Sequence, residues 1–286
     1  MSYDLFFRRR KGQFSKSQFF DYLASQEHYE CFDTGAYYQN QHTGVEFSLD
    51  LAPEDDEEID YHVECCIAYG VPEFFILEIG DQLESLAQAL DLLIWDPQQE
   101  DDPLYRPFQK LALLEGWKIY NRVAVKNLAG SGGSDRLYTY PGAKLTQIWR
   151  WNYQRPDFQK EAGNDVFVPQ IMMATDGTRV GTAATWSNGI PTYLPRTDLV
   201  LLVYLNLPLP PQADRERPIV IVSGESVWQL LADVPRKERI FPYLEMPTTM
   251  PDQRVIDFFS DPPALEPSWE GISFDSVVDE EYFSEI

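Results

Sequence analysis

Positive charge is scarce in this sequence. It has 23 Lys and Arg against 46 Asp and Glu, which gives a formal net charge of −23 over 286 residues. A protein that binds nucleic acid neutralises phosphates with Lys and Arg, and anionic membrane surfaces attract the same residues. We therefore expect neither nucleic acid nor a membrane as a partner.

Long apolar runs are also missing. The longest, at residues 199–205, has the length of a strand, whereas roughly 18 residues are needed to span a bilayer. A basic cluster at residues 8–11 is followed by the polar segment 12–18 rather than by the apolar stretch of a secretory signal. We expect a cytoplasmic protein.

Cysteine and histidine are rare, with three residues of each type. An odd number of Cys in a long chain is typical of reduced thiols. Two sets could bind a metal: His28 with Cys31, or His62, Glu64 and Cys66 at alternating positions of a predicted strand. Neither set has a further ligand at a recognisable spacing, so we expect no metal and no cofactor.

No complete catalytic motif is present. Residues 223–226 follow a predicted strand as a nucleophile elbow would, but the Gly-x-Ser-x-Gly pattern is incomplete, and Ser223 or Ser226 is predicted to cap a helix. The Gly-rich residues 130–134 lack the Gly-Lys-Ser/Thr ending of a phosphate loop. We expect no catalytic residue, although the 46 carboxylates leave a carboxylate-dependent hydrolase as an alternative.

What the sequence has in abundance is apolar and aromatic side chains, 44% and 14% of the residues, which predicts a folded chain. In the first half, alternating and helical patterns predict an α+β sandwich with an antiparallel meander. The predicted strands are 3–9, 29–38, 44–51, 61–69 and 92–95, and the predicted helices are 15–27, 80–90 and 107–125.

The second half is predicted to be mostly β, with strands at 145–153, 167–173, 181–186, 199–205 and 219–222 and a short helix at 227–232. The domains are predicted as an acidic α+β domain (1–126), a linker (127–143), a β-rich domain (144–250) and an acidic tail rich in Pro and aromatic residues (251–286). The linker contains the Gly-rich residues and few apolar side chains.

The acidic residues are unevenly distributed. Residues 17–105 contain 22 Asp and Glu and no Lys or Arg, so few internal ion pairs are expected there. The run at residues 54–58 has no Gly to make the turn of a Ca²⁺ site, which favours an exposed loop. On charge alone, we expect the partner-binding residues to be Glu54, Asp55, Asp56, Glu57, Glu58, Asp60, Asp101 and Asp102.

Residues 1–7, 42–51 and 91–98 resemble a group of bacterial immunity proteins associated with polymorphic toxins, and residues 149–152 are similar to a companion region. The resemblance implies an immunity protein, for a type VI secretion effector of nuclease type. None of the matching motifs is catalytic.

Charge and resemblance together favour an inhibitor that binds a basic toxin acting in the cytosol. A toxin that handles nucleic acid has a cationic cleft, and complementary charge speeds association. Besides the hydrolase, a structural or adaptor protein whose charge serves only solubility remains an alternative.

Overall fold

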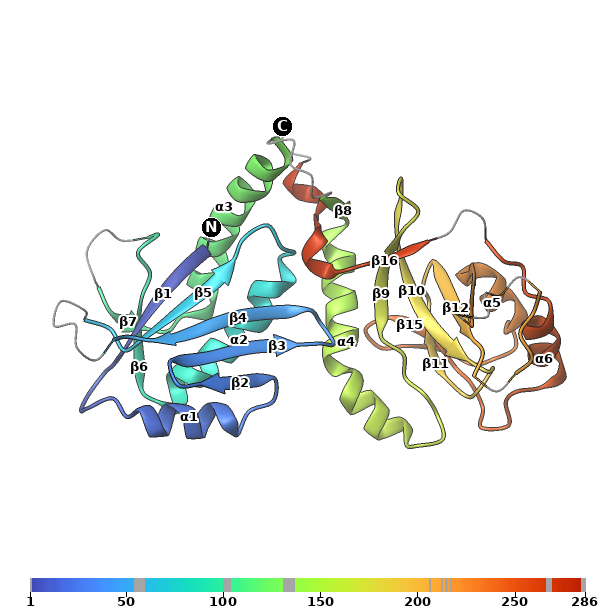
Figure 1. The fold of residues 1–286 in the computed structure, drawn as a ribbon, viewed down its shortest axis with the longest axis horizontal. Helices are drawn as coiled ribbons and strands as arrows, with labels where there is room; N and C mark the ends of the chain where they lie inside the picture. The colour runs from blue at the N-terminus through green and yellow to red at the C-terminus, as the bar shows by residue number, and fades with distance from the viewer. Residues whose placement is uncertain are drawn as a thin grey trace. The chain divides into compact units, whose positions relative to one another are not determined.

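The computed structural model describes residues 2–53, 60–99, 104–130, 137–205, 207–211, 213, 216, 218–265 and 269–283. The chain forms two compact units, one of Met1–Gly142 with Phe274–Ile286 and one of Ala143–Ser273. The described residues contain six α-helices and 17 strands (Figure 1). Because the largest sheet is antiparallel and helices accompany both units, the predicted α+β class is confirmed.

The first unit is built on a seven-stranded antiparallel sheet with the strand order β2-β3-β4-β5-β1-β6-β7. The predicted strand 29–38 is in fact two strands, because Asp33 and Thr34 form a turn before Gly35. A Cβ atom at Gly35 would lie 2.2 Å from the carbonyl oxygen of Leu49. The strands are β1 (Ser2–Arg9), β2 (Tyr29–Phe32), β3 (Gly35–Asn40), β4 (Val45–Leu51), β5 (Val63–Ala68), β6 (Leu92–Trp95) and β7 (Arg106–Pro107).

Alternation along the strands divides this sheet into two faces. On β1, Tyr3, Leu5 and Phe7 are fully buried, whereas the side chains between them are partly exposed. Three helices accompany the sheet: α1 (Lys16–Ala24), α2 (Phe74–Ala89) and α3 (Lys110–Gly130). In Figure 1, α2 lies behind β3 and β4. The buried face is therefore the helix-covered one, and the opposite face is called the open face below.

Helix α1 is capped by Ser15, whose hydroxyl accepts a hydrogen bond from the Gln18 N–H at 3.3 Å. In α3 the apolar side chains of Leu111 and Ile119 are exposed. The residues of α3 that are buried instead follow the helical period as Leu113, Gly116, Trp117, Asn121, Ala124 and Val125.

A fully buried carboxylate joins α2 to the β3–β4 hairpin. Oε1 of Glu78 accepts hydrogen bonds from the Tyr38 hydroxyl at 2.7 Å, the Asn40 amide at 2.8 Å and the Thr43 hydroxyl at 3.1 Å. A buried charge is tolerated only when donors of this kind replace its hydration. Glu78 is therefore a structural group, and it fixes the hairpin against the helix.

The last described residues return to the first unit. Strand β17 (Val277–Asp279) pairs in parallel with β8 (Tyr138–Tyr140), and two short 3-10 helices, η1 (Phe274–Ser276) and η2 (Glu280–Tyr282), flank it. The carboxylate of Asp279 accepts a hydrogen bond from the Glu73 N–H at 2.8 Å. The Asn121 amide of α3 donates to the Tyr282 hydroxyl at 3.0 Å. These two contacts attach the segment to α2 and α3.

The second unit contains a five-stranded sheet of order β13-β12-β10-β9-β16 and a three-stranded sheet of order β11-β15-β14. Strands β10 and β12 are parallel, and the other pairs in these sheets are antiparallel. The strands are β9 (Ile171–Thr175), β10 (Val180–Ser187), β11 (Tyr193–Pro195), β12 (Leu199–Val203), β13 (Ile219–Ser223), β14 (Arg236–Glu238), β15 (Pro242–Glu245) and β16 (Glu270–Ile272). Its helices are α4 (Gly142–Ala162), α5 (Gly224–Leu230) and α6 (Gln253–Ser260).

The strand predicted at 145–153 is wrong, because these residues belong to α4. Burial follows a period of 3.6 rather than 2 along the buried residues Leu145, Ile148, Trp149 and Asn152. The Asn152 side chain donates to the Ile171 carbonyl and accepts from the Ile171 N–H, both at 2.8 Å. The second unit is therefore less β-rich than expected, since a 21-residue helix packs against β9.

The predicted domain boundaries differ from the units. The linker expected at 127–143 includes the end of α3 and strand β8, and its residues 131–136 lie outside the described residues. The tail expected at 251–286 is divided: α6 and β16 belong to the second unit, and Phe274–Ile286 belongs to the first. Sequence patterns locate turns, but they do not show that a C-terminal segment returns to an earlier sheet.

Candidate partner-binding face

Carboxylates are concentrated on the open face of the seven-stranded sheet. Five of them come from four strands: Asp4 on β1, Glu30 on β2, Glu46 and Asp50 on β4, and Glu64 on β5. We call these five residues the acidic sheet face. Among the described residues, none of the five forms an ion pair with Lys or Arg.

The strand register places four members of the acidic sheet face in two neighbouring rows, and the fifth, Glu46, lies opposite Gln39 of β3. One row runs Glu30–Tyr37–Ser48–Cys66–Asp4 across β2, β3, β4, β5 and β1. The other runs Asp50–Glu64–Phe6–Trp95 across β4, β5, β1 and β6. Residues directly opposite on antiparallel strands have Cβ atoms about 4.5–5.5 Å apart. Asp50 and Glu64 are such a pair, so two like charges face each other.

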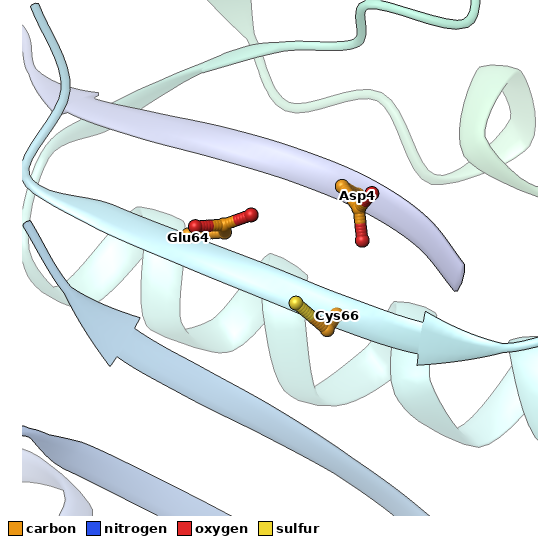
Figure 2. A group of neighbouring side chains, drawn as sticks. All are labelled: Asp4, Glu64 and Cys66. Carbon is orange, nitrogen blue, oxygen red and sulfur yellow. The ribbon is translucent and has the colours of Figure 1, made fainter. Parts of the chain in front are cut away.

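Asp4, Glu64 and Cys66 form the tightest group on this face (Figure 2). A carboxylate oxygen of Asp4, one of Glu64 and Sγ of Cys66 lie within 4.8 Å of one another. Partial burial and the Asp4 carboxylate raise the pKa of Glu64. Burial, Asp4 and Glu64 raise the pKa of the Cys66 thiol to about 12. Within the part of the chain that the structure describes, no Lys or Arg forms an ion pair with this group.

This group could supply two oxygen ligands and one sulfur ligand to a metal ion. A thiol must lose its proton to bind a metal, and the surrounding carboxylates oppose that loss. A structural zinc site also takes four ligands, and this group offers three. Oδ1 of Asp4 is buried without a hydrogen-bond partner in the described structure, so it can accept a bond from an incoming donor.

Aromatic side chains lie beside the acidic sheet face. The Phe6 ring is 4.6 Å from Tyr61 and 5.2 Å from Trp95, centroid to centroid. The Arg8 guanidinium lies 4.2 Å from the centre of the Tyr105 ring and 2.5 Å from the Asp60 carboxylate. Aromatic residues are enriched in protein-binding surfaces, so these rings are candidate contact residues.

Cations from outside the acidic stretch 17–105 reach into it. Besides Arg8 with Asp60, the ion pairs are Arg10 with Asp91, Lys110 with Asp81 and Lys118 with Glu73. The expectation of few ion pairs within the stretch omitted these flanking cations, which the fold brings back to it. The acidic sheet face lies on the other side of the sheet from α2 and α3, where Asp81, Glu73, Lys110 and Lys118 are located.

Of the partner-binding residues expected from charge, Asp60 is described. It lies next to Arg8 at the aromatic side of the open face, with Tyr105 donating to its carbonyl oxygen at 2.8 Å. Glu54, Asp55, Asp56, Glu57, Glu58, Asp101 and Asp102 lie outside the described residues. The prediction did not include the acidic sheet face itself. In the sequence, the acidic sheet face could have been found from the alternation of acidic and apolar residues along β1, β4 and β5.

The other residues considered from sequence take up structural positions. His62 stacks on Phe14, 4.9 Å between ring centroids, so Asp4 rather than His62 joins Glu64 and Cys66. Ser223 caps α5 as predicted, accepting from the Ser226 N–H at 3.1 Å. A Cβ atom at Gly224 would lie 1.9 Å from the Thr197 carbonyl oxygen, which explains the glycine at the start of α5.

A recess of about 100 Å³ lies at the edge of the same sheet. It is lined by apolar side chains such as Leu5 and Ile94 and by the carboxylate of Asp96. Burial raises the pKa of Asp96, which accepts hydrogen bonds from the Tyr3 hydroxyl and the Gln99 amide. A glycosidase uses two carboxylates on either side of its substrate, whereas Asp96 is the sole carboxylate among the described residues lining this recess.

Comparisons of the chain with protein-family models, with curated proteins and with solved structures found no match. Within the described ranges, no helix has both the length and the apolar character needed to cross a membrane.

Proposed function

We propose that this chain is an immunity protein that binds and neutralises a basic, cytosol-acting toxin, of nuclease type, through the acidic sheet face. One observation carries the proposal: five carboxylates on four strands of one sheet form no ion pair with Lys or Arg in the described structure. Placing like charges opposite one another costs stability, and a cationic partner would remove that cost.

The aromatic residues beside the face support the same function. Charge complementarity steers a partner and raises its association rate, whereas affinity comes mainly from aromatic and Arg anchors that are desolvated on binding. Phe6, Tyr61 and Trp95 supply such anchors next to the carboxylates. A nuclease presents Lys and Arg around its cleft, and the acidic sheet face offers the complementary surface without catalysing a reaction.

The test begins with the gene immediately upstream. Its product is expressed alone and together with this chain, and growth and DNA integrity are measured. We expect the product to be toxic alone and harmless when the chain is present. Failure of the chain to protect cells from a toxic upstream product would contradict the proposal.

A matched pair of variants locates the binding face. Asp4→Asn, Asp50→Asn and Glu64→Gln together should reduce protection and slow association. Asp21→Asn, Glu84→Gln and Glu115→Gln on α1, α2 and α3 change the net charge by the same amount and should leave protection intact. Equal loss in both variants would show that total charge, rather than this face, is what matters.

A further inference from the structure

The second unit contains a pocket of about 210 Å³ with aromatic walls. Trp151 and Phe158 come from α4, Tyr193 from β11 and Tyr243 from β15, and the charged residues Glu161 and Arg239 complete the lining. The Trp151 ring centroid is 5.4 Å from that of Phe158 and 5.8 Å from that of Tyr243. Tyr193 is 5.3 Å from Tyr243. The four rings therefore form a continuous wall.

The wall is rigid where it is deepest. Trp151 and Phe158 are 1% and 4% exposed, and the Trp151 indole donates to the Pro169 carbonyl at 2.9 Å. The rim, by contrast, is solvent-exposed: the side chains of Arg239 and Glu161 retain 48% and 59% of their accessible surface. Because the ion pair is exposed and the aromatic residues below it are buried, Arg239 can leave Glu161 and be replaced by another cation without unfolding of the pocket.

The pocket already holds one guanidinium group. The Arg239 guanidinium carbon lies 4.3 Å from the centre of the Phe158 ring. Its two terminal nitrogens donate to the two carboxylate oxygens of Glu161, at 2.6 Å and 3.3 Å. Stacking on an aromatic face combined with a two-point bond to a carboxylate is the geometry that favours guanidinium over ammonium. The contacts of Arg239 thus show that the aromatic wall and Glu161 together accommodate a guanidinium group.

Further carboxylate charge surrounds the pocket. Burial and the Glu245 carboxylate, which accepts a bond from the Tyr193 hydroxyl at 3.3 Å, raise the pKa of Tyr193. The Glu161 carboxylate also raises the pKa of Tyr193. Lys237 lies 3.5 Å from Glu245 and offsets part of that charge. A second guanidinium would therefore meet both aromatic faces and negative potential once Arg239 has moved away.

We propose that this pocket is a binding site for a guanidinium group from outside the chain, and that Arg239 is the resident occupant that the incoming group displaces. The guanidinium belongs either to a small solute or to an arginine side chain of another protein. This inference does not depend on the acidic sheet face, which lies in the other unit.

Calorimetric titration with agmatine and with the peptide Gly-Arg-Gly tests the site. Removing the competitor by Arg239→Ala should raise the affinity for agmatine about tenfold. Adding Glu161→Gln to that variant should lower the affinity for agmatine by about the same factor, because the guanidinium then lacks the carboxylate that accepts its charge-assisted hydrogen bonds. Diaminopentane, which carries ammonium groups, should bind more weakly than agmatine.

Arg236→Ala is the matched control, because Arg236 stacks on Trp228 and does not line the pocket. It should bind agmatine as the unaltered chain does. Binding of agmatine but not of the peptide would assign the site to a solute, and binding of both would assign it to arginine side chains as well. If Arg239→Ala is folded by circular dichroism and binds neither probe, the proposal is overturned. Equal affinity with and without Arg239 would also overturn it.

Discussion

Asp50 and Glu64 lie directly opposite each other on β4 and β5, so two carboxylates occupy one cross-strand pair in the middle of a sheet. The Tyr61 hydroxyl donates to Glu64 at 3.4 Å and the Ser48 hydroxyl to Asp50 at 3.1 Å. These neutral donors moderate the repulsion without removing it. The pair therefore places two like charges opposite each other, an arrangement that lowers the stability of the folded state.

Removing one member of this pair should stabilise the fold. Burial, the Asp4 carboxylate and, to a smaller extent, Asp50 raise the pKa of Glu64 above its ordinary value of 4.5, so the folded chain binds this proton more tightly than the unfolded chain. The stability that Glu64 contributes is therefore present below pH 4.5 and is lost as the pH rises through the raised pKa. At pH 7, Glu64→Gln should be more stable by about 0.2–1 kcal/mol in urea denaturation.

Glu30→Gln is the control, because Glu30 lies on the same face but opposite Tyr37 rather than a carboxylate. It should change stability by less than Glu64→Gln at pH 7. If the two variants behave alike at every pH, the repulsion between Asp50 and Glu64 is too weak to matter.

Asp279 should make the C-terminal segment sensitive to pH. Burial, the largest cause, raises its pKa from 3.8 to about 6, while the Glu73 N–H lowers it. The stability it contributes is complete below pH 3.8 and is lost as the pH rises through about 6. Asp279→Asn keeps an oxygen that accepts from Glu73 and removes the buried charge, so it should stabilise the protein at pH 7.5 by about 1–3 kcal/mol.

Asp279→Ala removes both the charge and the hydrogen-bond acceptor, whereas Asp279→Asn removes the charge alone. Comparing the two variants therefore separates the two contributions to stability. It should be less stable than Asp279→Asn at every pH, since the Glu73 N–H at the start of α2 then lacks its acceptor. Thermal unfolding between pH 4 and 8 measures both variants. A wild-type stability that rises from pH 5 to pH 7 in parallel with Asp279→Asn would assign the pH dependence to other groups.

Glu78 should be among the least replaceable side chains of the first unit. Glu78→Ala leaves the donors of Tyr38, Asn40 and Thr43 without their shared acceptor and should cost about 3–5 kcal/mol. Glu78→Gln retains a carbonyl oxygen and should cost less. Urea denaturation followed by tryptophan fluorescence measures both, and equal costs would show that the charge, not the acceptor, is required.

The acidic loop predicted from the sequence can be compared with the sheet face in one kinetic experiment. Replacing Glu54, Asp55, Asp56, Glu57 and Glu58 by Gln and Ser should slow association with the toxin and flatten its salt dependence, because steering depends on exposed charge. The Asp4, Asp50 and Glu64 variant should in addition speed dissociation, since these residues lie beside Phe6 and Trp95. Unchanged rates in both variants would leave the charge with a role in solubility only.

Local pattern was sufficient for much of the first unit. Alternation along β1, β4 and β5 identified the strands, because a strand with one buried face must repeat every two residues. A cap at Ser223 or Ser226 was predictable, since a Ser hydroxyl satisfies an N–H group about three residues further on, and Ser223 is the one that does so. The α+β class follows from these local signals, which depend on near neighbours along the chain.

Other features depend on contacts between residues that are distant in the sequence. For these the local sequence pattern gave either a wrong prediction or none. Residues 145–153 resemble a strand, yet Asn152 bonds both backbone groups of Ile171, and packing on β9 favours the helix. The contact of Asp279 with Glu73 joins residues that are 206 positions apart in the sequence and leaves no local signal. The sequence by itself determined the excess of acid and the alternation that carries it. Only the tertiary structure decided which carboxylates are paired by flanking cations and which stay together on one open face, because strand register and helix packing set those distances.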